Sequence, residues 1–357
     1  MHRGTEGSCQ FRWNLCPKIH QGGPTLAKTI PAGSNPLRQR ERAALDSPPR
    51  LSRQGVPTRG RSAGMTRCRM ETRPLFRLLL SVVLGSLFHS PLAAEVLRDV
   101  EYARVGGVPL LLDLYQPQVP CIGVVVYVHG GGWSGGSRTD CPISGLVTDG
   151  FAVASVDYRL STQAPFPANI HDLKAAVRFL RSEAGRLGIP AGRIAIAGSS
   201  AGGHLAALAG VSSGVPALEG TVGKCREASS SVRAIVSFFG ASNLQTILRQ
   251  SSEYGLQMRV PALQRLLGGT PEEQPELARL ASPVAHLDPK DPPLLLFHGD
   301  ADPQMPVQQS AEFSSAYEAA GLAVKLHVLP GSKHGGAEFY DAIRMALVRD
   351  FLKEALR

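Results

Sequence analysis

Residues 193–210 read RIAIAGSSAGGHLAALAG, an apolar run that a serine-glycine turn interrupts before an alanine-rich segment follows. The first residues have the composition of a buried strand, and the segment from Ala201 onward has that of a helix. Between them, Gly198 to Gly202 match the pattern G-x-S-x-G, which is typical of a sharp turn between a strand and a helix. We therefore predict a strand, a tight turn and a helix, with Ser200 projecting from the turn.

Strands and helices alternate on both sides of this stretch. The run IGVVVYV at residues 122–128 is apolar throughout, as is typical of a parallel strand that is buried on both faces. We expect strands at 100–105, 108–117, 122–133, 151–160, 193–200, 232–240, 292–300 and 324–331, and helices at 170–188, 201–210, 307–321 and from Glu338 to about Leu356. This order predicts an α/β fold with a mainly parallel central sheet flanked by helices.

Residues 241–291 contain helical and irregular patterns without a strand candidate. Two short candidate helices are broken by glycines and by Pro261. We therefore expect a small helical cap inserted into a single domain that spans residues 95–357.

A serine hydroxyl is a weak nucleophile, and it needs a nearby base that a third group orients. In folds built around this turn, the chain order is serine, acid, histidine. Asp302 follows the strand at 292–300, and His334 follows the strand at 324–331. Both loops leave the carboxyl ends of strands, where open α/β sheets place their sites. We predict Ser200 as nucleophile, His334 as base and Asp302 as the supporting acid.

Other residues near these positions are the alternatives. Asp300 is the second candidate acid, but Asp302 lies farther into the loop and precedes a proline that helps to fix the turn. The rival bases lie within strands or helices, where a structural role is more common: they are His171, His298 and His327. His204 lies one helical turn after Ser200 and is expected to pack beneath it.

A glycine triplet follows the strand that begins at residue 122, in the sequence HGGGW at 129–133. Three consecutive glycines lose much conformational entropy on folding unless their backbone is needed. We predict that the amides of Gly131, Gly132 and Ala201 bind the oxyanion of a tetrahedral intermediate. The aromatic and sulfur-containing side chains on the neighbouring loops should line a small substrate pocket: Trp133, Phe239 and Met305.

The N-terminal part differs in composition from the rest. Residues 1–69 hold 13 Lys/Arg against 3 Asp/Glu, so they account for the net charge of +9. The remainder is nearly neutral, which argues against a nucleic-acid partner. We expect residues 1–69 to be a disordered or over-called extension, with translation starting at Met65 or Met70 instead of Met1.

A signal peptide is expected at residues 70–94. Positive residues precede an apolar run from Leu78 to Phe88, and the small residues Ala93 and Ala94 follow it. The run is shorter than the ~20 residues of a membrane-spanning helix, so we expect cleavage, a secreted or periplasmic product that begins near Glu95, and no stable membrane association afterwards.

The remaining composition gives no sign of a metal or cofactor. Cys121, Cys141 and Cys225 follow the expected cleavage point, and disulfides can persist in an exported protein. No spacing resembles a zinc motif, and the phosphate-binding and dinucleotide fingerprints are absent. We therefore predict no metal and no cofactor.

The combination of HGGGW at 129–133 and GSSAGG at 198–203 resembles the α/β-hydrolase superfamily, in particular carboxylesterases related to hormone-sensitive lipase. The acid loop HGDADPQMPV departs from that group and is more similar to dienelactone hydrolases and prolyl-oligopeptidase-type domains. Such a mixture is typical of secreted bacterial esterases similar to the bifunctional acetyl-xylan and feruloyl esterases. The resemblance covers about Val100 to Arg357 and implies the same three residues, Ser200, Asp302 and His334.

The expected function is hydrolysis of short-acyl or compact aromatic esters, including esters linked to polysaccharide. A serine peptidase is the alternative enzyme, although Ala201 replaces the tyrosine common after the nucleophile in that branch. A catalytically inactive binding protein is the alternative outside enzymes, but such a role would not require nucleophile, acid, base and oxyanion glycines together.

Overall fold

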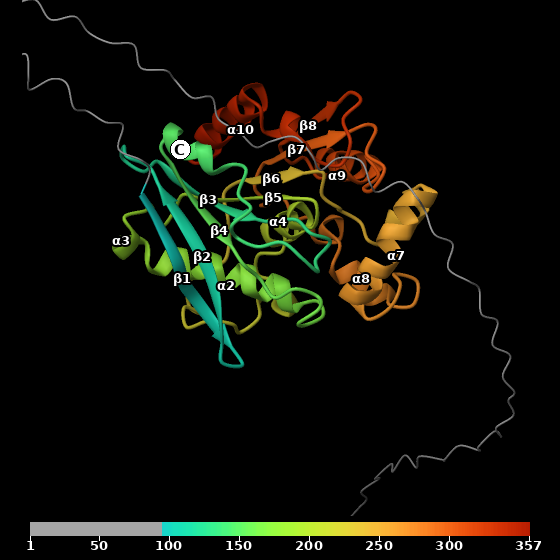
Figure 1. Cartoon of the computed structure of the whole chain (residues 1–357), viewed down its shortest axis with the longest axis horizontal. Coiled ribbons are helices and arrows are strands. Elements are labelled where there is room, and N and C mark those ends of the chain that lie inside the picture. The colour runs from blue at the N-terminus through green and yellow to red at the C-terminus, as the bar shows by residue number, and fades with distance from the viewer. Residues whose placement is uncertain (1–94) are drawn as a thin grey trace, which may run out of the picture. The chain divides into compact units, whose positions relative to one another are not determined.

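The computed structural model describes residues 95–357, which form one eight-stranded sheet with helices on both faces (Figure 1). The strand order across the sheet is β1-β2-β4-β3-β5-β6-β7-β8. The strands are β1 (Glu95–Val105), β2 (Val108–Gln116), β3 (Gly123–Val128), β4 (Phe151–Val156), β5 (Ile194–Ser199), β6 (Ile235–Phe238), β7 (Leu294–Gly299) and β8 (Val324–Leu329).

The sheet is mainly parallel, as the sequence predicts. The first two strands form an antiparallel pair, and β2 pairs antiparallel with β4, whereas all further pairings are parallel. Every residue of β3, β4, β5, β6 and β7 is buried, in keeping with their near-continuous apolar sequences. Their carboxyl ends therefore lie along one edge of the sheet, between helices.

Helices connect the strands and cover them. They are α2 (Ala168–Ser182), α3 (Ala184–Leu187), α4 (Ala201–Val211), α5 (Pro216–Glu219), α6 (Ile247–Gln250), α7 (Glu253–Leu267), α8 (Pro275–Leu280), α9 (Gln308–Ala319) and α10 (Ala342–Ala355), with the 3-10 helices η2 (Ser144–Asp149), η3 (Pro283–His286) and η4 (Ala337–Tyr340). All the described residues belong to one compact unit.

Two hydrophobic clusters form the core, one on each face of the sheet. The alternate β3 residues Val124 and Val126 face a cluster that includes side chains of α2, α4 and α9. Val125 and Tyr127 face the other cluster, to which η2 and α10 contribute. Figure 1 accordingly shows α10 on the opposite side of the sheet from α2 and α4. A strand that alternates its side chains between two apolar layers must be buried on both faces.

Residues 241–291 fold as α6, α7, α8 and η3 and contain no strand, as expected from the sequence. Of the glycines expected to break these helices, Gly268 ends α7 in the left-handed conformation (φ 79°), whereas Gly255 lies within its first turn. Pro261 is contained within α7 instead of ending it. The longest helix of this segment is therefore more continuous than the broken pattern predicts.

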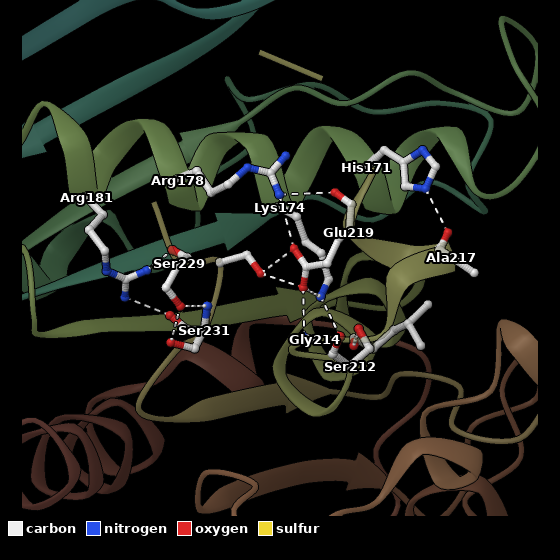
Figure 2. Close-up of polar contacts among 12 residues, drawn as sticks. His171, Lys174, Arg178, Arg181, Ser212, Gly214, Ala217, Glu219, Ser229 and Ser231 are labelled. Atoms are coloured by element: carbon white, nitrogen blue, oxygen red, sulfur yellow. Dashed lines mark hydrogen bonds and ion pairs between the residues drawn. The ribbon is translucent and has the colours of Figure 1, made fainter. Parts of the chain in front are cut away.

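A buried polar network ties α2 to the segment after α4 (Figure 2). The Lys174 ammonium is fully buried and donates to Glu219 Oε1 at 2.8 Å and to the Ser212 carbonyl at 2.7 Å. Arg178 donates to the same carboxylate at 3.1 Å. Although burial opposes it, hydrogen bonding to Lys174 holds the pKa of Glu219 below its usual range. Two cations from one helix face thus share one acid across the fold.

The last helix begins later than the sequence predicts. Residues 337–340 form η4, and α10 starts only after Asp341, whose side chain accepts a hydrogen bond from the Arg344 amide at 2.8 Å. Such an N-cap satisfies an amide that has no partner within the helix. The predicted start at Glu338 was therefore wrong by one turn of helix.

Cys121, Cys141 and Cys225 are all free, so no disulfide forms among the described cysteines. The predicted extension and signal peptide, up to Ala94, lie outside the described residues. Within residues 95–357, no helix is both long and apolar enough to cross a bilayer.

Candidate active site

Ser200 occupies a strained turn between β5 and α4. Its backbone has φ 55° and ψ −120°, a conformation that non-glycine residues rarely adopt. The neighbouring glycines make this turn possible, because a Cβ at Gly198 would overlap the Gly202 carbonyl and one at Gly202 would overlap the Val128 carbonyl. The turn raises the Ser200 hydroxyl into a cavity at the carboxyl edge of the sheet.

His334 and Asp302 meet Ser200 from two other loops. His334 Nε2 lies 2.8 Å from Ser200 Oγ, and His334 Nδ1 lies 2.6 Å from Asp302 Oδ2. The three residues come from the ends of β5, β7 and β8, which are neighbours through β6. The structure therefore brings together the three residues that the sequence predicts as nucleophile, base and acid.

The Asp302 carboxylate is buried and fully engaged. Its Oδ1 accepts the amides of Gln304 at 2.8 Å and Met305 at 2.9 Å, while Oδ2 faces His334. His298 Nε2 lies 3.4 Å from the same Oδ2. Burial acts to raise the pKa of Asp302, but the contacts with His298 and His334 hold it well below its usual range. The acid is thus ionised and orients the His334 ring so that Nε2 faces the serine.

The glycines predicted to bind an oxyanion line the same cavity as Ser200. Gly131 (φ 110°) and Gly132 (φ 58°) have backbones in the region that favours glycine. The Gly131 carbonyl accepts the amides of Ser134 and Gly135, which turns the loop back on itself. Ala201 is the first residue of α4, where a helix amide has no acceptor within the helix. None of the three amides donates to a backbone carbonyl among the described residues, so they are available to a ligand.

The alternative residues have structural partners. Asp300 is exposed and accepts the Gly331 amide at 2.6 Å, so it braces the His334 loop without contacting the imidazole. Ser199 Oγ is hydrogen-bonded to the hydroxyls of Tyr127 at 2.9 Å and Tyr340 at 2.5 Å. Neither residue replaces Asp302 or Ser200 in the arrangement.

The other histidines are likewise occupied. His204 is fully buried beneath the turn, as predicted, and accepts the Trp133 indole N–H at 3.1 Å. His171 contacts the Ala217 carbonyl at 3.0 Å, and His327 stacks on Phe297. His298 contacts Ser310 Oγ and the Met305 carbonyl. Among the rival bases, only His298 approaches the site, and it does so behind Asp302.

The cavity has a volume of about 690 Å³. Phe239, which the sequence predicts in the pocket, lines it and lies 4.9 Å from His334 between ring centroids. Trp133 and Met305 do not line it, because both side chains are fully buried in the core. The Trp133 indole N–H donates to His204 instead. Met305 contributes to the site only through its backbone amide, which donates to Asp302.

One wall of the cavity was missed by sequence reasoning. Helix α7 contributes Met258, Arg259 and Arg265, and Tyr340 contributes from the chain before α10. The charges on α7 were visible in the sequence, but no local pattern indicates that the helix packs over a site whose residues are distant in the chain. Among residues 95–357, no group of three or more His, Cys, Asp or Glu side chains is placed to bind a metal.

The BD-FAE family model matches residues 112–317. Esterase LipQ of Mycobacterium tuberculosis is 30% identical over 276 residues, which cover 75% of this chain and 63% of that protein. Esterase LipC of the same organism is 32% identical over 234 residues, covering 63% and 56%. The chain thus spans somewhat more than half the length of these curated relatives.

Solved structures show the same similarity. A truncated carbohydrate esterase from gut microbiota is 30% identical with a TM-score of 0.67, over 73% of this chain and 96% of that one. Est2 of Thermogutta terrifontis, solved with propionate bound, is 28% identical with a TM-score of 0.59, over 73% and 94%. Both similarities extend over nearly the whole of the solved chains.

Proposed function

Because the chain belongs to the BD-FAE family of α/β hydrolases, we propose that it is a serine hydrolase that cleaves carboxylic esters. The observation that carries the proposal is the continuous hydrogen-bonded relay from Ser200 through His334 to Asp302. Nucleophile, base and orienting acid within hydrogen-bond distance form the arrangement that activates a serine.

In this mechanism, Ser200 Oγ attacks the ester carbonyl while His334 Nε2 accepts the hydroxyl proton. Asp302 holds the ring in the required tautomer and stabilises the imidazolium that forms. The amides of Gly131, Gly132 and Ala201 donate to the developing oxyanion. His334 then protonates the departing alcohol, and a water molecule, deprotonated by the same imidazole, cleaves the acyl-enzyme.

We propose short-acyl or compact aromatic esters as substrates, including acetyl or feruloyl groups on polysaccharide. The cavity is modest in volume, and its walls combine Phe239 with polar groups such as Asp140 and Gln257. Among its structural relatives, one is a carbohydrate esterase and another was solved with propionate and with butyrate bound. The first supports an ester linked to carbohydrate, and the second supports a short acyl group.

We also propose that the protein is exported and begins near Glu95 after cleavage of the apolar segment at residues 70–94. The support is the sequence of that segment alone: positive residues, a short apolar run and small residues at its end. N-terminal sequencing of secreted material tests this proposal, and a mature protein that retains Leu78 to Phe88 would contradict it.

The catalytic assignment is tested with Ser200→Ala and Ser199→Ala. We expect the first variant to lose at least about a thousandfold in kcat on p-nitrophenyl acetate, because only binding and oxyanion donors remain. It should also resist labelling by a fluorophosphonate probe. Ser199→Ala removes the hydroxyl contacts with Tyr127 and Tyr340 and is the matched control. If Ser199→Ala lost labelling and Ser200→Ala kept it, Ser199 would be the nucleophile. If the wild type were not labelled either, a binding role would be favoured. Faster turnover of peptide amides than of esters would instead indicate a peptidase.

A further inference from the structure

Arg259 is a buried cation on α7, the helix that forms one wall of the cavity. Only 4% of the residue is exposed. Its Nε donates to the Gln304 carbonyl at 3.1 Å, and its guanidinium carbon lies 6.0 Å from the centroid of the Trp133 ring. Gln304 belongs to the Asp302 loop and Trp133 follows the oxyanion glycines. The guanidinium is thus held between the two loops that build the site.

This cation has no carboxylate partner among residues 95–357. Every other arginine or lysine that is buried to a similar extent there, namely Lys174 and Arg178, is paired with Glu219. Asp302 is the acid whose charge acts on Arg259, but its oxygens are occupied by His334 and by two amides. Burial lowers the pKa of Arg259, and the charge of Asp302 only partly offsets this effect.

The terminal nitrogens of Arg259 have no hydrogen-bond partner among the described residues, since only its Nε donates, to the Gln304 carbonyl. These two Nη atoms are not among the fully buried, unpartnered side-chain atoms of residues 95–357, so they keep some exposure. The residue lines the same cavity as Ser200 and His334, which is the space that a bound ester would fill. Arg265 adds a second cation to this wall. Asp140 also lines the cavity, but it is exposed and forms no ion pair with either arginine.

We propose that Arg259 binds a carboxylate of the substrate, so that the preferred substrates are esters that also carry a free carboxylate group. The proposal rests on the proposed ester hydrolysis at Ser200. A guanidinium offers two parallel N–H donors that match a carboxylate, and a site shielded from water strengthens the interaction. The substrate carboxylate would supply the negative charge with which Arg259 is not paired in the protein.

The test compares carboxylate esters with neutral amides of the same shape. In the first pair, ethyl hydrogen succinate is compared with ethyl succinamate, so the charge lies on the acyl side of the ester. In the second pair, 4-acetoxybenzoate is compared with 4-acetoxybenzamide, so the charge lies on the alcohol side. We expect wild-type kcat/KM to favour the carboxylate in one of the two pairs. In Arg259→Gln, the carboxylate-to-amide ratio of that pair should fall by about 10- to 100-fold, as expected for loss of hydrogen bonds to a charged group.

Ratios measured on one sample do not depend on the fraction of folded protein. Arg259→Lys keeps the charge but loses the paired donors, so its ratio should lie between those of the wild type and Arg259→Gln. Arg249→Gln removes an exposed arginine of α6 that does not line the cavity, and it should leave the ratio unchanged. As a measurement on the wild type alone, succinate should inhibit hydrolysis of p-nitrophenyl acetate at least tenfold more strongly than succinamide does.

The outcomes separate this inference from the proposed function. Hydrolysis of the neutral esters with no carboxylate preference, or a ratio that Arg259→Gln leaves unchanged, would overturn the role of Arg259 and leave the esterase proposal standing. Equal inhibition by succinate and succinamide would also overturn it. No hydrolysis of any ester by the wild type would instead defeat the proposed function.

Discussion

Asp302 and Asp300 are two residues apart and have different surroundings. Asp302 is buried against His334 and accepts two amides, whereas Asp300 is exposed and accepts one. A carboxylate that fixes an imidazole tautomer affects the rate of reaction, while one that braces a turn affects mainly local order.

We therefore expect Asp302→Asn to lower kcat on the order of 10⁴-fold, because the amide no longer favours the useful tautomer of His334. The matched variant Asp300→Asn should lower it less than about tenfold. Steady-state kinetics on p-nitrophenyl acetate, with circular dichroism to monitor folding, checks both values. Reversed effects would transfer the acid role to Asp300.

We expect His204 to make the stability of the protein depend on pH. Burial lowers its pKa to about 4, and the Trp133 indole already donates to Nδ1, so that Nε2 carries the proton and donates to the Ala281 carbonyl at 2.7 Å. The imidazole is therefore neutral in the folded protein over most of the range in which an unfolded histidine, with a pKa near ~6.5, is charged.

Between those two pKa values the unfolded chain binds the extra proton, so stability decreases as the pH falls. We expect this group to reduce the free energy of unfolding by on the order of 3 kcal/mol between pH 7 and pH 4. Urea denaturation across this range measures the slope. In His204→Gln, whose amide can still accept from Trp133 and donate to Ala281, the slope should be shallower, and an identical slope would contradict the assignment.

Among the elements, helix α2 carries two buried cations that pair with the same acid. Lys174 and Arg178, both buried on this helix, share Glu219 (Figure 2). Near its carboxyl end, Glu183 and Arg186 form an ion pair whose side chains are 35% and 60% exposed. Removing one partner of a buried pair leaves an uncompensated charge, whereas breaking an exposed pair costs little.

Accordingly, Glu219→Gln should lower the free energy of unfolding by about 3 kcal/mol. Glu183→Gln should change it by less than about 0.5 kcal/mol. Chemical denaturation followed by fluorescence distinguishes the two variants. Because Glu219 does not line the active-site cavity, kcat/KM of the folded fraction should be retained, and equal stabilities of the two variants would show that the network contributes nothing.

At the scale of the whole molecule, helix α7 and the strand-end loops line one cavity, and we propose that they limit the length of the substrate. The cavity of about 690 Å³ is bounded by charged and polar side chains as well as by Phe239 and Met258. A lipase that acts on aggregated lipid needs a large continuous apolar surface, whereas this wall carries the cations Arg259 and Arg265.

In a series of p-nitrophenyl esters, kcat/KM should therefore peak between acetate and butyrate and decrease steeply by octanoate. Rates for the full series at fixed enzyme concentration give the profile. A maximum at palmitate, or activation at an oil interface, would show that the cavity opens into an apolar groove and that the substrate is a lipid.

The strands and the positions of the reactive residues could be predicted from sequence, because both depend on local information. Alternating apolar segments define the parallel sheet, and the glycines around Ser200 are needed by the turn itself. Asp302 and His334 were predicted from their places after strands whose carboxyl ends share an edge. The loops that follow neighbouring parallel strands meet whatever their sequence, so the three residues could be placed together without a structure.

Only the tertiary structure decided what surrounds them. Trp133 and Met305 lie in the loops predicted for them, but their side chains turn into the core, because the end of a strand does not determine where the next side chain points. Arg259 reaches the cavity only because α7 packs across loops distant in sequence. Which side chains face a site depends on long-range burial and on the pairing of charges, and a local sequence pattern contains neither.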